Sequence, residues 1–79
     1  EEMIDESIRI YPNPTKNQFT IETEKGSHIT VLDFTGRIVW QQKQQKSEEV
    51  IDVEAWGRGV YFVEVISGEM SITNKVIVQ

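Results

Sequence analysis

The chain has 79 residues, no cysteine, a net charge of −5, 38% hydrophobic residues and 27% charged residues. This length suits a single domain, and the lack of cysteine excludes disulfide frameworks, thiol catalysis and thiolate zinc sites. The acidic balance gives no electrostatic attraction for nucleic acid or for an anionic membrane surface, and the longest apolar run, at residues 60–63, is far too short to insert into a bilayer.

Residues 1–7 are acidic and show no hydrophobic periodicity. They lack the basic region and apolar core of a secretory signal peptide. We expect them to be the loosely ordered end of a linker from an upstream domain, and we expect the folded domain to cover residues 8–79.

Seven short β-type runs follow one another, and turn-forming residues separate them. The predicted strands cover residues 8–11, 18–22, 27–33, 37–41, 48–54, 60–66 and 71–78. Alternation of apolar and polar residues predicts an inward face made of Phe19, Ile21, Ile29, Val31, Ile51, Val53, Tyr61, Val63, Val65, Val76 and Val78. Leu32 and Phe34 fall on the opposite face, which predicts cover on both sides near the end of the third strand. The facing of the fourth strand is ambiguous, with Val39 on one side and Ile38 and Trp40 on the other.

The connections have their own signals. Two prolines, Pro12 and Pro14, must end the first strand, because proline has no backbone N–H and restricts the residue before it. Gly26 and Gly36 are candidates for positive φ in turns. The polar run at residues 41–46 predicts an exposed hairpin tip, and Trp56, beside a glycine-flanked corner, is expected to cap the core.

Short successive strands with short links favour antiparallel pairing, because parallel pairs need long crossovers. The prediction is an all-β fold, a seven-stranded immunoglobulin-like antiparallel β-sandwich. An open barrel is the second choice.

The residues predict no catalytic constellation and no cofactor. The single histidine, His28, has no second histidine to share a metal with it. The carboxylates at residues 48–54 lack the alternating oxygen ligands of a calcium loop. A sugar-stacking platform built from Trp40, Trp56, Tyr11 and Tyr61 is a functional alternative, although core packing explains these aromatic residues at strand ends more simply.

Four spaced motifs occur in order along the chain. They are Tyr11-Pro12-Asn13-Pro14, then Asp33-Phe34-Thr35-Gly36-Arg37, then Gly59-Val60-Tyr61, and finally Lys75-Val76-Ile77-Val78-Gln79. This series resembles the type A C-terminal sorting domain of the type IX secretion system, from about residue 8 to residue 79. The resemblance implies a sandwich of seven strands and no enzymatic activity.

The resemblance also implies partners and a route. The partners would be a cargo domain on the N-terminal side, the outer-membrane translocon and a surface sortase that cleaves in or before residues 1–7. The route would run through the periplasm to the cell surface or the extracellular space. Translocon recognition is placed on Lys75, Val76, Ile77, Val78 and Gln79.

A final strand at a sheet edge would leave unpaired backbone groups that a partner could read by strand addition. Lys75 and Gln79 would then face away from Val76 and Val78, although a solubilising role at a sheet edge is the simpler explanation of Lys75 taken alone. The other motif residues are expected to be structural: Tyr11, Pro12, Asn13, Pro14, Asp33, Gly36, Gly59 and Tyr61.

Overall fold

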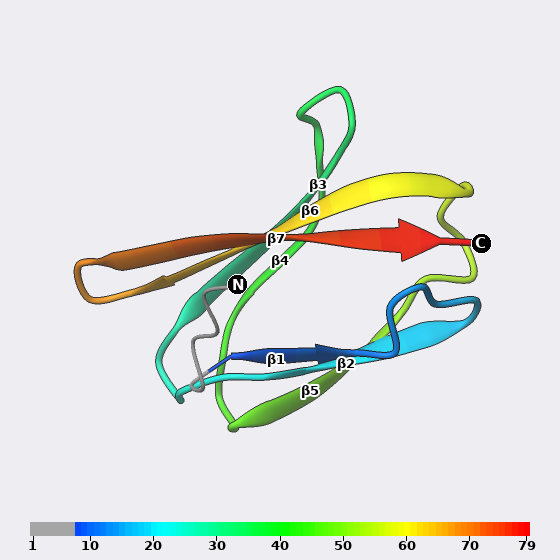
Figure 1. Cartoon of the computed structure of the whole chain (residues 1–79). Helices are drawn as coiled ribbons and strands as arrows, with labels where there is room; N and C mark the ends of the chain where they lie inside the picture. Colours follow the sequence, from blue (N-terminus) through cyan, green and yellow to red (C-terminus); the bar gives the residue numbers. More distant parts are fainter. Residues whose placement is uncertain (1–7) are drawn as a thin grey trace, which may run out of the picture.

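The computed structural model describes residues 8–79, and in that range it contains seven β-strands and no helix (Figure 1). The strands are β1 (Arg9–Tyr11), β2 (Gln18–Glu22), β3 (His28–Asp33), β4 (Ile38–Lys43), β5 (Glu48–Asp52), β6 (Gly59–Ser67) and β7 (Met70–Val78). The number of predicted strands is confirmed, and their bounds agree to within two residues. The predicted linker end, residues 1–7, lies outside the described residues.

The strands form two antiparallel sheets, ordered β1-β2-β5 and β4-β3-β6-β7. Figure 1 shows the two sheets as separate layers. Hairpins join β1 to β2, β3 to β4 and β6 to β7, and the other three connections pass from one sheet to the other. The last strand, β7, is an edge strand of the four-stranded sheet.

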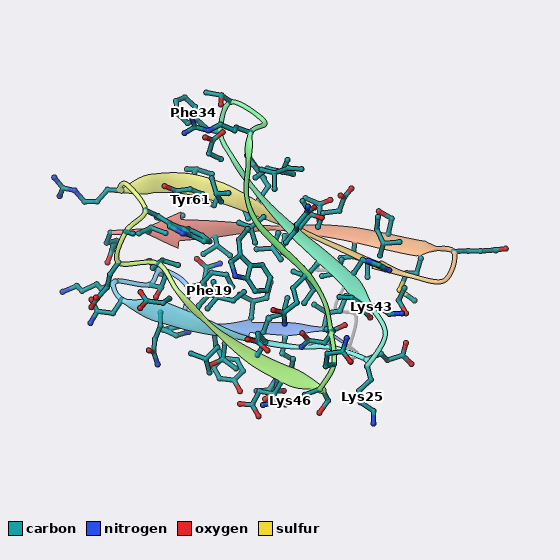
Figure 2. All side chains as sticks on the ribbon, turned by 180° about the vertical axis from the view of Figure 1, so that it is seen from behind. Phe19, Lys25, Phe34, Lys43, Lys46 and Tyr61 are labelled. Atoms are coloured by element: carbon teal, nitrogen blue, oxygen red, sulfur yellow. The ribbon has the colours of Figure 1, made fainter. Side chains whose placement is uncertain are left out.

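The core fills the space between the two sheets. All eleven residues predicted to face inward are buried, and Phe19, Ile21, Val31, Val63 and Val76 have no exposed surface. Phe19 and Tyr61 point into this space from opposite sheets (Figure 2). Alternation predicts burial well here because successive side chains of a strand point to opposite faces.

The fourth strand does not follow the predicted alternation. Val31 lies opposite Trp40, but the next residue, Leu32, lies opposite Ile38. Val39 is therefore the extra residue of a β-bulge, so Ile38 and Trp40 fall on opposite faces. Their predicted placement on a shared face is wrong, and both Val39 and Trp40 pack against the core.

The predicted exposed hairpin tip at residues 41–46 is also wrong. Its first half belongs to β4, and Gln44 is buried. The backbone N–H of Gln44 donates to Ser27 O (2.7 Å), and Gly26 N–H donates to Gln44 O (2.9 Å). The segment that follows β4 crosses from the four-stranded sheet to β5 in the three-stranded sheet, so it runs over the end of the core instead of forming a hairpin tip.

Candidate functional site

The C-terminal residues alternate between the core and the solvent. Val76 and Val78 are buried in the core, whereas Lys75, Ile77 and Gln79 are exposed. The predicted facing of this strand is confirmed. Val76 lies opposite Tyr61 and Val78 lies opposite Gly59, so the end of β7 pairs with the start of β6.

The outer edge of this strand is already occupied. The Asn13 side chain donates from Nδ2 to Lys75 O (2.8 Å), and its Oδ1 accepts from Ile77 N–H (3.0 Å). Thr15 N–H donates to Ile77 O (2.9 Å), and Gln79 N–H donates to Thr15 O (2.8 Å). We call residues Asn13–Thr15 the edge clamp. The expectation of unpaired backbone groups along Lys75–Gln79 is wrong, because the clamp pairs with them.

The clamp bonds through the backbone at Thr15 and through the side chain at Asn13, which lies between two residues that cannot donate. Pro12 and Pro14 have no backbone N–H and cannot form an ordinary ladder. The Asn13 amide offers one donor and one acceptor, as a peptide group does, and it bonds β7 across a separation of 62 residues in the chain. Both prolines follow cis peptide bonds. Beyond them, Thr15 is buried, forms a parallel bridge with Val78 and donates its hydroxyl to Gln18 O.

The structure thus brings together motifs from both ends of the chain. In Figure 1 the loop between β1 and β2 lies on the same side of the molecule as the C-terminus. From the sequence, these two motifs are interpreted separately, the first as structural and the second as a recognition signal. The available signal was an asparagine, with its peptide-like amide, between two residues that lack an N–H.

Tyr11 belongs to the outer surface of the three-stranded sheet. Its hydroxyl donates to Glu22 Oε2, and this hydrogen bond to a carboxylate is the main reason that the pKa of Tyr11 is raised. Arg9 forms a salt bridge with Glu22 (3.1 Å) and lies 5.2 Å from the centre of the Tyr11 ring. These contacts tie β1 to β2.

Asp33 and Gly36 form the turn between β3 and β4, as predicted. Asp33 Oδ1 accepts from the backbone N–H groups of Thr35 (2.9 Å) and Arg37 (3.0 Å) and from the Thr35 hydroxyl (2.6 Å). These hydrogen bonds, led by the one from the Thr35 side chain, lower the pKa of Asp33. Gly36 has φ of +90°, which L-residues with side chains rarely adopt.

Tyr61 anchors the corner beneath the end of β7. Its hydroxyl donates to Gly57 O (2.6 Å), and its ring centre lies 5.0 Å from that of Trp56. Trp56 also meets Phe19 edge to face, with ring centres 6.4 Å apart. The prediction that Trp56 caps the core is confirmed.

The aromatic residues do not form the alternative sugar-stacking platform. Trp40 and Trp56 are partly buried against the core, and Tyr61 is inside it. Tyr11 belongs to a different sheet from Trp40 and Tyr61. Trp40, Trp56 and Tyr61 pack in or against the core, so their faces are not available together with Tyr11 on one outer surface.

Within residues 8–79, no group of three or more histidine or acidic side chains converges as a metal site would require. The same range contains no helix that is long and apolar enough to cross a membrane.

The model of the family described as "Secretion system C-terminal sorting domain" matches residues 9–79. The chain belongs to this family. The match includes all seven strands of the sorting domain, together with the clamp and the C-terminal residues that it holds.

Two relatives are consistent with this assignment. The sorting domain is 30% identical over 69 residues to the ulvan lyase NLR42 of Nonlabens ulvanivorans, a match that covers 84% of this chain and 13% of the lyase. It also resembles PorZ, described as an essential bacterial surface component of the type IX secretion system of Porphyromonas gingivalis. That match has a TM-score of 0.77 and 25% identity, and it covers 94% of this chain and 12% of the PorZ chain. The sorting domain therefore corresponds to a small part of each relative.

Proposed function

We propose that this domain is a non-catalytic sorting signal that directs an N-terminal cargo domain across the outer membrane through the type IX secretion system. The observation that carries the proposal is the family match over residues 9–79. The partial match to a much longer lyase supports the presence of a separate cargo domain in the parent protein.

The proposed route runs through the periplasm, where the domain folds, to the cell surface or the extracellular space. A surface sortase would then cut in or before residues 1–7 and attach the cargo to the surface. The fold supports an upstream cut, because β1 begins at Arg9 and pairs with β2, so cleavage after that point would remove a strand of the sandwich.

We also infer an immunoglobulin-like class for the sandwich. The division of the strands supports it, with the first, second and fifth in one sheet and the third, sixth and seventh in the other. The constant immunoglobulin arrangement places the fourth strand with the first sheet, whereas here β4 joins the second.

The translocon is proposed to recognise the region Lys75–Gln79, with different roles for alternate residues. The side chains of Lys75, Ile77 and Gln79 are accessible. Val76 and Val78 would act indirectly, because their burial holds the strand in place.

A reporter fusion tests this function. Residues 1–79 are fused to the C-terminus of a periplasmic reporter in a host that has this secretion system. Export of the reporter supports the proposal, and retention in the periplasm contradicts it. Lys75→Ala should reduce export, and Lys43→Ala is the matched control because Lys43 is also an exposed strand lysine.

A further inference from the structure

The end of β7 presents three surfaces, and two of them are closed. Its outer edge is covered by the clamp, Asn13–Thr15. Its inner face carries Val76 and Val78, which are buried. Among the described residues 8–79, none covers the outer face, with Lys75 and Ile77, which is therefore the surface of this strand end that the described part of the chain leaves open.

This outer face continues across all four strands as an apolar surface. We call it the outer apolar face, and its residues are Leu32, Ile38, Val60, Phe62 and Ile77. Ile38 lies opposite Leu32, which in turn lies opposite Phe62. Val60 lies opposite Ile77. Opposed side chains are about 5 Å apart, so these residues form one continuous surface.

The exposure of this surface is high for apolar side chains. Ile38 is 52% exposed and Ile77 is 36% exposed, while the other three are half-buried. Phe34, in the adjoining turn, is 76% exposed and projects from the end of the hairpin (Figure 2). The predicted cover over Leu32 and Phe34 is not provided by any segment within residues 8–79. Contiguous exposed apolar surface typically marks an interaction site.

The outer face of the three-stranded sheet is different. Its cross-strand rows combine charged and polar residues: Arg9, Glu22 and Glu48 in one, Gln18 and Asp52 in another. Between them lies a row of Tyr11, Thr20 and Val50. Val50 is 49% exposed, but the polar residue Thr20 separates it from Tyr11. The two outer faces therefore differ in chemistry although both are accessible.

Charge identifies the kind of partner. Lys75 lies opposite Phe62, at the margin of the outer apolar face, and forms no salt bridge with any residue of the described range 8–79. Glu64, two residues from Phe62 on the same strand face, bounds the surface on the side away from the C-terminus. The end of the surface nearest the C-terminus thus combines apolar side chains with a cation, on a chain whose net charge is −5. Its complement is an apolar protein surface that carries a carboxylate.

We propose that a protein component of the secretion machinery docks on the outer apolar face and places a carboxylate against Lys75. This inference rests on the proposed sorting function. It means that the signal is a folded surface built from four strands, and that Ile38, which lies on the opposite edge strand from Lys75, contributes to it.

The test compares Ile38→Lys with Val50→Lys in the reporter fusion. The two positions are matched, because each is an apolar residue on an edge strand and each is about half exposed. Ile38→Lys should reduce export about tenfold, because it places a charge in an apolar contact of the interface, while Val50→Lys should export like the wild type. Circular dichroism of the purified domains checks that both variants are folded. If lysine unfolds either one, Ile38→Thr and Val50→Thr replace them, because threonine keeps a high strand propensity.

The charge is tested separately. Lys75→Glu should reduce export more than Lys75→Ala, because glutamate would repel the partner's carboxylate.

Equal export of the Ile38 and Val50 variants would overturn the inference while leaving the sorting function intact, provided that the unmodified fusion is exported. Failure of the unmodified fusion itself would overturn the sorting function. Sedimentation of the purified domain completes the test. If the domain is a dimer and Ile38→Lys dissociates it, the face binds a second copy of this chain and the proposed partner is wrong.

Discussion

The edge clamp predicts that one exposed asparagine contributes strongly to stability. Asn13→Ala removes the hydrogen bonds to Lys75 O (2.8 Å) and from Ile77 N–H (3.0 Å). Each hydrogen bond contributes about 0.5–1.5 kcal/mol net, and the site is exposed enough for water to replace part of it, so we expect a loss of about 1–2 kcal/mol. The free energy of unfolding of a small domain falls by about 1 kcal/mol for each molar of urea, so the urea concentration at the unfolding midpoint should fall by about 1–2 M.

Asn17→Ala is the control for this measurement. Asn17 lies in the same loop and is exposed, and its backbone carbonyl, which alanine keeps, accepts from Val53 N–H (2.9 Å). Urea unfolding of the two variants and the wild type should therefore separate Asn13→Ala from the other two. Amide hydrogen exchange at Ile77 should also accelerate in Asn13→Ala alone. Equal midpoints for the two variants, with unchanged exchange at Ile77, would refute the clamp.

Three further predictions concern stability. Gln44 is 1% exposed and its side-chain amide has no hydrogen-bond partner within the described residues, so Gln44→Met should raise the free energy of unfolding by about 1–2 kcal/mol. Thermal unfolding checks this against the exposed Gln41→Met, and a loss of stability in the Gln44 variant would contradict it. Asp33→Asn should be less stable than the wild type at neutral pH. The folded pKa of Asp33 is lowered from its ordinary value of 3.8. The carboxylate therefore stabilises the fold fully above pH 3.8, and this stabilisation is lost as the pH falls through the folded pKa. If urea unfolding gives the same difference in stability between Asp33→Asn and the wild type at every pH, the charge plays no part. Val78→Ala should cost about 2 kcal/mol through the cavity it leaves, and chemical denaturation should show a far smaller change for the exposed Ile77→Ala.

Much of the fold could be predicted from the sequence because the core follows the period of a β-strand. Phe19 and Ile21 alternate with polar residues, as do Ile51 and Val53, and all four are buried. The turn at Asp33 was also predictable, because its hydrogen bonds are local. These features depend on residues that are close in sequence.

The remaining features depend on contacts between distant residues. The bulge in β4 reverses the facing of Ile38, and only the register with β3 reveals it. Burial of Gln44 follows from the passage of its segment between sheets. In the candidate site, alternation predicted the facing of Lys75 and Val76 correctly. The pairing of Asn13 with the last strand joins residues 62 positions apart, and the local pattern of an asparagine between two prolines does not indicate which strand it pairs with.

The most direct test of the sorting function compares export of the reporter fusion in two strains. One strain has an intact type IX translocon, and the other lacks it. We predict reporter on the surface or in the medium of the first strain and in the periplasm of the second. The same distribution in both strains would contradict the proposed function.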